Sequence, residues 1–148
     1  MDSSINWDDI NDTVKEFSLN GETHHGKVVS VYDGDTIKVV FPIYKRMYKW
    51  NCRLNRVDTP ELRTKSDTEK KYGYYVRDQL RDKILNKVVR VECKDYDKYG
   101  RLLSEIFIED ENVNNWLISN EYAFEYNGGT KQSWEDYLSQ KPQLLDKC

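Results

Sequence analysis

The spacing of apolar residues divides the chain into a helical beginning, a run of strands and a mostly helical end. In residues 7–17 the apolar side chains recur every three or four positions, which predicts a short amphipathic helix. They are Trp7, Ile10, Val14 and Phe17. From His24 onward apolar and polar residues alternate, which is the period of a half-buried strand. Residues 1–22 are therefore predicted to be an acidic N-terminal extension of the main domain.

Five segments rich in β-branched residues predict strands. They cover residues 27–31, 36–41, 47–56, 87–94 and 102–108. Asp33-Gly34 predicts a hairpin turn between the first two strands. A helix is predicted over residues 67–85, with Ser66 or Asp67 as its cap and apolar residues four apart on one stripe. Two further short helices are predicted at residues 113–119 and 133–138.

This order of elements predicts an α+β domain over residues 23–140. Five short strands with a helix between the third and the fourth favour a five-stranded OB-fold β-barrel with about three attached helices. Residues 141–148 are predicted to form a C-terminal tail. Periodicity alone would also allow a small open sheet covered by helices.

The net charge of −3 hides an uneven distribution. Residues 26–110 contain 19 Lys and Arg against 14 Asp and Glu, whereas residues 1–25 contain 1 against 6. A basic middle permits a polyanionic partner but does not demonstrate one. The chain has no apolar run of transmembrane length and does not begin with a secretory signal, so we expect an intracellular protein without a membrane partner.

The cysteine content argues against two kinds of site. Cys52, Cys93 and Cys148 contain no CxxC pair and are odd in number, which disfavours both a disulfide framework and a zinc site. Cys52 and Cys93 lie within apolar alternations, so we expect them to be buried free thiols.

Three polar segments carry the candidate chemistry. They are Asp33–Thr36 (DGDT), Arg53–Glu61 (RLNRVDTPE) and Asp97–Arg101 (DKYGR). Each alone could be an ordinary turn. Together they provide oxygen ligands for a cation, a carboxylate base for water and arginines for phosphate oxygens, which is the set that metal-assisted cleavage of a phosphodiester needs.

In this order and spacing the three segments resemble the staphylococcal nuclease (thermonuclease) family. The DGDT, R-x(4)-DTPE and DKYGR motifs of that family all occur here, and Lys71-Tyr72-Gly73 matches its KYG. The resemblance covers about residues 24–138. It implies a calcium-dependent nuclease that hydrolyses DNA and RNA and leaves 3′-phosphate ends.

The resemblance also implies roles for the acidic residues. The carboxylates of Asp35 and Asp58 and the backbone carbonyl of Thr59 would bind Ca²⁺. Asp33 would support that site without touching the ion. Glu61 would act on the attacking water, as its general base or by positioning it.

The remaining roles concern the phosphate and the nucleotide. Arg53 and Arg101 would hold the scissile phosphate and stabilise the transition state, and Arg101 would also stabilise the leaving 5′-oxygen. Lys98 and Tyr99 would contact a terminal phosphate. Tyr126 would stack on the nucleotide or form a hydrogen bond to it.

Several alternatives stay open. Tyr122 and Phe124 compete with Tyr126 for the nucleotide contact, since the sequence around them matches the family loosely. Residues 42–50 form either an ordinary hairpin or a further contact for single strands. The acidic ends favour a short or single-stranded substrate over a duplex. We expect a monomer, and the competing function is a non-catalytic module that binds nucleic acid or protein.

Overall fold

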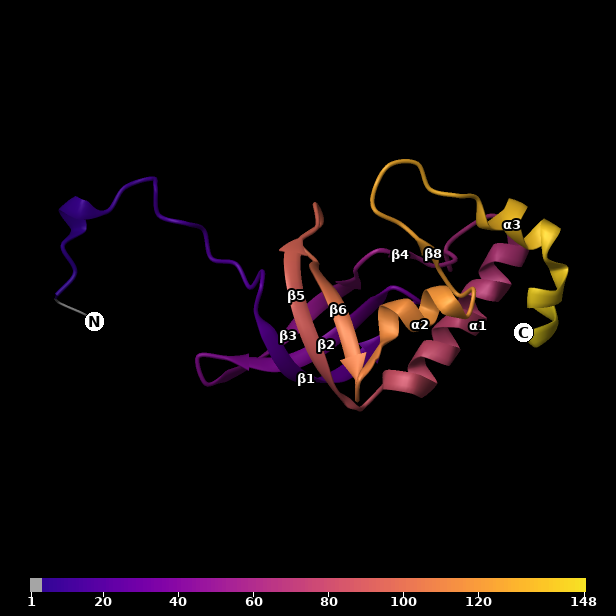
Figure 1. Cartoon of the computed structure of the whole chain (residues 1–148), viewed down its shortest axis with the longest axis horizontal. Coiled ribbons are helices and arrows are strands. Elements are labelled where there is room, and N and C mark those ends of the chain that lie inside the picture. Colours follow the sequence, from indigo (N-terminus) through magenta and orange to yellow (C-terminus); the bar gives the residue numbers. More distant parts are fainter. Residues whose placement is uncertain (1–3) are drawn as a thin grey trace.

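Five strands close into a barrel in the order β3-β2-β1-β5-β6. The computed structural model of the protein describes residues 4–148. The barrel strands are β1 (Thr23–Val31), β2 (Thr36–Ile43), β3 (Arg46–Leu54), β5 (Val88–Tyr96) and β6 (Leu102–Ile108). Neighbouring strands are antiparallel, except that β3 and β6 pair in parallel and place Cys52 opposite Leu102. This pairing closes the sheet, which confirms the predicted OB-type barrel and rules out the open sheet (Figure 1).

Three predicted helices form close to their expected bounds, namely α1 (Asp67–Ile84), α2 (Val113–Ser119) and α3 (Trp134–Gln140). A final 3-10 helix, η2 (Pro142–Lys147), lies in the segment predicted as a tail and buries Leu144. Ser66 caps α1, because its hydroxyl accepts a hydrogen bond from the Glu69 N–H at 3.3 Å. Short strands β4 (Val57–Asp58) and β8 (Phe124–Glu125) pair beside the barrel, and β7 (Glu111–Asn112) extends its edge at β6. No helix among residues 4–148 is long and apolar enough to cross a membrane.

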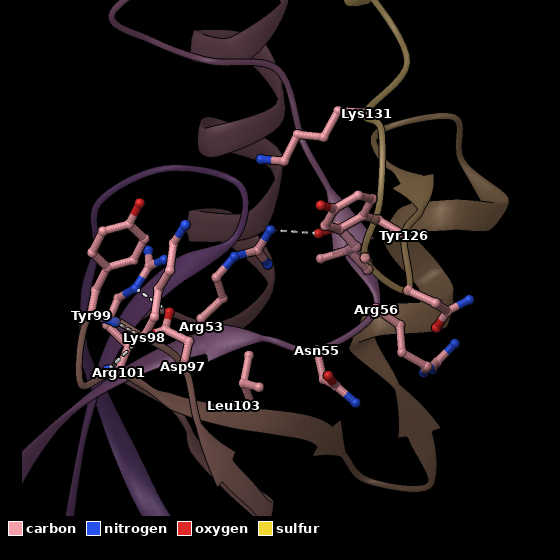
Figure 2. Close-up of a pocket in the computed structure, with 13 residues that line it drawn as sticks. Arg53, Asn55, Arg56, Asp97, Lys98, Tyr99, Arg101, Leu103, Tyr126 and Lys131 are labelled. Atoms are coloured by element: carbon pink, nitrogen blue, oxygen red, sulfur yellow. Dashed lines mark hydrogen bonds and ion pairs between the residues drawn. The ribbon is translucent and has the colours of Figure 1, made fainter.

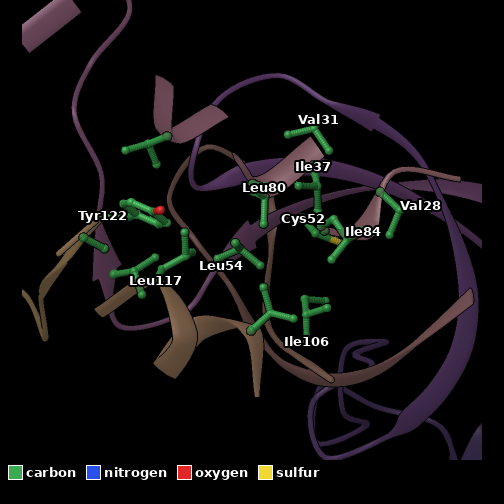
Figure 3. Close-up of a cluster of buried hydrophobic side chains, with 14 of the residues drawn as sticks. Val28, Val31, Ile37, Cys52, Leu54, Leu80, Ile84, Ile106, Leu117 and Tyr122 are labelled. Carbon is green, nitrogen blue, oxygen red and sulfur yellow. The ribbon is translucent and has the colours of Figure 1, made fainter. Parts of the chain in front are cut away.

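The core fills the barrel and continues under α1. Figure 3 shows Val28, Ile37 and Leu54 from the strands meeting Leu80 and Ile84 from α1, and all five are fully buried. The predicted apolar stripe of α1 therefore faces the barrel. Cys52 and Cys93 are free and buried, as predicted, and burial raises the pKa of Cys52 to about 12.

The N-terminal helix predicted over residues 7–17 is absent, apart from a single 3-10 turn at Trp7–Asp9. Trp7 and Phe17 are 69% and 60% exposed, and the segment runs away from the barrel (Figure 1). An isolated helix of this length is only marginally stable in water. The side chains of Asn6 and Asn11 instead accept hydrogen bonds from nearby backbone N–H groups, which favours turns over a helix.

The β2–β3 hairpin ends at Tyr44 and Lys45, which both have left-handed φ angles. Trp50, lower on the hairpin, stacks on Phe41 with ring centroids 5.1 Å apart. At about 3.3 Å per strand residue, the tip at Arg46 lies roughly 23 Å along β3 from the Arg53 end of the strand. The hairpin is therefore well separated from the end of the barrel where the three motifs meet.

Candidate active site

A pocket of about 660 Å³ opens where the end of β3 meets the β5–β6 turn and the loop that follows β8. Figure 2 shows Arg53 in the middle of it, with Lys98, Tyr99 and Arg101 on one side and Tyr126 on the other. Two of the three motifs predicted from the sequence thus contribute side chains to one cavity. The third motif joins it through an ion pair between Asp35 and Arg53.

The side chain of Arg53 is held in place by backbone carbonyl groups of the residues that follow it. Its Nη1 donates to the carbonyl oxygen of Leu54 at 2.6 Å, and its Nη2 donates to that of Val57 at 2.9 Å. The same Nη2 lies 3.4 Å from Oδ2 of Asp35. The side chain is only 12% exposed, so the guanidinium group is oriented before any ligand arrives.

Arg101 is positioned by Asp97, a role that the sequence analysis did not assign. Oδ1 of Asp97 accepts the backbone N–H groups of Tyr99 and Arg101, both at 2.9 Å, and Oδ2 accepts Nε of Arg101 at 2.7 Å. Partial burial would raise the pKa of Asp97, but these donors hold it below its usual value. Nη1 of Arg101 also donates to Oγ1 of Thr36 at 3.3 Å. The sequence did contain a hint of this contact, since an aspartate four residues before an arginine, with a glycine turn between them, can reach the arginine side chain.

The proposed metal ligands Asp35, Asp58 and Thr59 are brought together by close packing of two loops. A Cβ atom on Gly34 would come within 2.8–2.9 Å of three side-chain atoms of Thr59, closer than such atoms approach. Gly34 is not among the described residues with a positive φ, so the glycine serves this contact and not the left-handed turn that an Asp-Gly pair suggests.

Like charges are concentrated where these loops meet. Asp58 is 3% exposed, and burial raises the pKa of its carboxyl group. Asp35 raises that pKa further, while Lys131 opposes the shift. The pKa of Glu61 is also raised, first by desolvation and then by the charge of Asp35. Asp33 accepts the N–H of Asp35 at 3.1 Å, and burial together with Asp35 raises its pKa to about 7.

This set of donors fits a hard cation in part. Within residues 4–148 no group of three or more His, Cys, Asp or Glu side chains could hold a metal ion by itself. Two carboxylates and one carbonyl leave at least three of the six to eight ligands of Ca²⁺ to water and substrate. The residues therefore suit an ion that binds weakly alone and more tightly with a phosphate.

Burial decides between the three candidate aromatic residues. Tyr126 lines the pocket, and its hydroxyl donates to the carbonyl oxygen of Gly129 at 2.9 Å. Tyr122 is 7% exposed and belongs to the core. Phe124 stacks on Trp134 with ring centroids 3.9 Å apart. Tyr126 is thus the aromatic of the three that is available to a ligand in this pocket.

Lys131 is a further pocket residue that the sequence analysis missed. Its Nζ lies 3.5 Å from Oδ1 of Asp58 and 5.4 Å from the ring centroid of Tyr126. It sits in an irregular loop after two glycines, where no motif marks it. The backbone N–H of Tyr126 donates to the carbonyl oxygen of Arg56 at 2.8 Å, which fixes the start of this loop.

Lys98 and Tyr99 occupy the rim of the pocket. Tyr99 is 72% exposed, with Nζ of Lys98 at 5.2 Å and the guanidinium carbon of Arg101 at 5.5 Å from its ring centroid. An exposed ring flanked by two cations can receive a base and its phosphate together.

Comparison with known proteins shows the family of this chain. Residues 51–143 match the family model described as staphylococcal nuclease homologue. The chain belongs to the staphylococcal nuclease family. The family match begins after the DGDT segment, so it includes Asp58, Thr59 and Glu61 but not Asp35.

Three relatives illustrate the range of similar proteins. An uncharacterized protein of Methanocaldococcus jannaschii is 34% identical over 125 residues, covering 71% of this chain and 58% of that protein. An uncharacterized endonuclease of Escherichia coli O157:H7 is 34% identical over 103 residues, covering 69% and 61%. The thermonuclease of Staphylococcus hyicus is 34% identical over 102 residues, covering 68% and 57%. The chain therefore spans about three fifths of the length of the curated relatives it matches.

Proposed function

We propose that the protein is a calcium-dependent nuclease that hydrolyses DNA and RNA and leaves 3′-phosphate and 5′-hydroxyl ends. One observation carries this proposal: Arg53 and Arg101 line one cavity, and Arg53 is paired with Asp35 beside the crowded carboxylates. Positive donors for phosphate and oxygen ligands for a cation thus adjoin each other. The endonuclease and thermonuclease names of relatives support the same class of reaction.

The acidic residues would prepare the nucleophile. Asp35, Asp58 and the carbonyl of Thr59 would hold Ca²⁺, which when bound would neutralise charge on the phosphate. Glu61 would accept the proton of the attacking water. Its raised pKa suits that task, because a general base works best when its pKa lies near the working pH.

The arginines would bind the phosphate as its charge develops. Each guanidinium group offers a planar fork of N–H donors that matches two phosphate oxygens, which an ammonium group cannot reproduce. Arg53 and Arg101 are already oriented by their hydrogen bonds, so little reorganisation is needed in the transition state. Arg101 would also stabilise the departing 5′-oxygen.

Single strands are the proposed preferred substrate, and the protein is proposed to act as a monomer. Tyr99 and Tyr126 offer faces on which unpaired bases could stack, with Lys98 beside them for a terminal phosphate. Residues 1–25 carry six acidic side chains against one basic, which disfavours the denser charge of a duplex.

The test is cleavage of end-labelled single-stranded DNA, single-stranded RNA and duplex DNA with Ca²⁺, with Mg²⁺ and with a chelator. We expect cleavage with Ca²⁺, none with the chelator, and products whose 3′ ends are substrates for a phosphatase. Glu61→Gln is the control for contaminating nucleases. Binding without cleavage by the folded wild-type protein would instead indicate the non-catalytic module.

A further inference from the structure

A second basic pocket, of about 370 Å³, lies beside the loops that carry Asp33 and Glu61. We call it the Tyr32–Tyr74 pocket. Its lining includes two tyrosines and three arginines, namely Tyr32, Tyr74, Arg63, Arg77 and Arg81. None of these residues belongs to the three motifs, and none lines the cavity around Arg53.

Chain connectivity places this pocket next to the proposed reaction centre. Tyr32 follows β1 and directly precedes the Asp33–Asp35 loop, and its N–H donates to the carbonyl oxygen of Thr36 at 2.9 Å. Three residues of chain span at most about 11 Å, so the Cα atom of Tyr32 lies within that distance of Asp35. Arg63 follows Glu61 by two residues.

Helix α1 forms the opposite wall and packs directly on the Glu61 segment. A Cβ atom on Gly73 would lie 3.0 Å from the carbonyl oxygens of Pro60 and Glu61, so a larger residue would push the two segments apart. Tyr74 is the next residue. Nε of Arg81, two turns further on, donates to the carbonyl oxygen of Val31 at 3.2 Å and ties the helix to the end of β1.

The chemistry of this pocket matches an unpaired polynucleotide. Tyr32 and Tyr74 remain 49% and 42% exposed, although each has a rigid anchor on the fold. The guanidinium carbon of Arg77 lies 4.6 Å from the ring centroid of Tyr74. Asp78 pairs with Arg77 at 3.1 Å and with Arg81 at 3.9 Å, so this one carboxylate offsets part of the charge of the three lining arginines. Exposed aromatic rings within a basic groove are the features that bind single strands without regard to sequence.

We propose that the Tyr32–Tyr74 pocket binds a single-stranded stretch of the substrate on the far side of the scissile phosphate from Tyr126. The strand would run from the first cavity across the Asp35 and Glu61 loops to Tyr32 and Tyr74. This inference rests on the proposed function for the identity of the ligand. It predicts that the protein contacts several nucleotides, as OB folds do with about 4–16 per fold.

The first test measures binding in a chelator, where no cleavage is expected, by fluorescence anisotropy of a labelled trinucleotide and a labelled twelve-nucleotide DNA. The variant Tyr32→Ala/Tyr74→Ala should bind the twelve-nucleotide strand about fivefold or more weakly, the scale of losing stacked bases. Its affinity for the trinucleotide should stay unchanged. The matched control, Tyr44→Ala/Tyr48→Ala, removes two exposed tyrosines from the distant hairpin and should leave both affinities unchanged.

The second test uses charge in place of stacking. Arg63 is exposed, so Arg63→Gln should leave thermal unfolding unchanged. Loss of one phosphate contact should lower the slope of log affinity against log salt by about 0.7 for the twelve-nucleotide strand. Arg46→Gln, at the exposed hairpin tip, is the matched control and should keep the wild-type slope.

The outcomes separate this inference from the proposed function. Unchanged affinity for the long strand in Tyr32→Ala/Tyr74→Ala would overturn the second pocket alone, and so would a larger loss in the hairpin control. A length-dependent loss in a protein that does not cleave would keep the pocket and overturn the nuclease. Wild-type protein that binds neither strand in the chelator would overturn the second pocket, while cleavage with Ca²⁺ would still decide the proposed function.

Discussion

Two buried carboxylates in this barrel have opposite surroundings. Glu105 is 6% exposed and accepts Nε and Nη2 of Arg56 at 3.1 and 2.8 Å and Nδ2 of Asn112 at 3.0 Å. Burial alone would raise its pKa, but these donors lower it. Asp58 is as well buried, yet it forms an ion pair with the half-exposed Lys131 at 3.5 Å, and its pKa is raised.

The comparison distinguishes a buried carboxylate whose charge the protein balances from one whose charge it balances only in part. A buried carboxylate costs free energy unless donors surround it, and Glu105 has such donors within the protein. At Asp58 and Glu61, burial and then the charge of Asp35 raise the pKa, and Asp58 adds to the shift at Glu61, so this cluster holds negative charge that the protein balances only in part. The fold tolerates this cost at the place where we propose that Ca²⁺ binds.

The largest effect should come from Glu61→Gln. We expect turnover to fall roughly 10²–10⁴-fold, the scale for losing a general base, while thermal unfolding stays unchanged because no buried donor is left unpaired. Single-turnover cleavage of a labelled strand measures it. Glu109→Gln removes an exposed glutamate from a turn and serves as the control. Full activity of Glu61→Gln would remove this residue from the mechanism.

Arg101→Lys should follow, with a loss of roughly 10²–10³-fold in kcat, comparable to losing one transition-state donor. The charge survives, but the fork that Asp97 orients is lost. Arg90→Lys, whose guanidinium group lies over Phe107 outside the pocket, controls for the exchange itself. A mild effect at position 101 would mean that this arginine acts only as a distant charge.

On the structural side of the comparison, Glu105→Gln should lower the free energy of unfolding by about 1–3 kcal/mol, because the charged hydrogen bonds to Arg56 are weakened in a buried site. Urea unfolding measures it. Activity per folded molecule should change only a few-fold. A variant as stable as the wild type would show that the Arg56–Glu105 pair gives the barrel no net stability.

The smallest expected effect is the pH dependence of the stability difference between the wild type and Glu105→Gln. The pKa of Glu105 is lowered in the folded state from the ordinary glutamate value of 4.5, so its stabilisation is present above that pH and is lost as the pH falls through the folded pKa. The stability gap between the wild type and Glu105→Gln should therefore be constant near neutrality and shrink in acid. A stability difference that grew in acid would mean that the pKa of Glu105 is raised, not lowered, in the folded state.

The sequence predicted the elements that show a regular pattern of apolar and polar residues. The strand alternations and the stripe of α1 were correct because burial on one face sets their periods. The helix at residues 7–17 was wrong because its apolar side chains face no partner in the described chain. A pattern reports what a segment could bury, and the rest of the fold decides whether anything covers it.

The candidate site also has a part that the sequence could predict and a part that it could not. Motifs located the arginines and carboxylates, since the order of the residue types was enough. Lys131, the choice of Tyr126 over Tyr122, and the Tyr32–Tyr74 pocket depend on which loops approach one another. Those approaches are tertiary contacts between residues far apart in the chain, and no local pattern encodes them.

The contact of Gly34 with Thr59 gives a criterion for distinguishing distant family members whose two loops can pack together from those whose loops cannot. A homologue could keep each carboxylate and arginine and still carry alanine at this position. The added methyl group would push the two loops apart, because three side-chain atoms of Thr59 lie only 2.8–2.9 Å from the position that its carbon would take. A comparison based on the charged residues alone would still classify such a homologue as an active enzyme. A glycine without any chemistry of its own is therefore a better marker of the proposed cation site than another acidic residue would be.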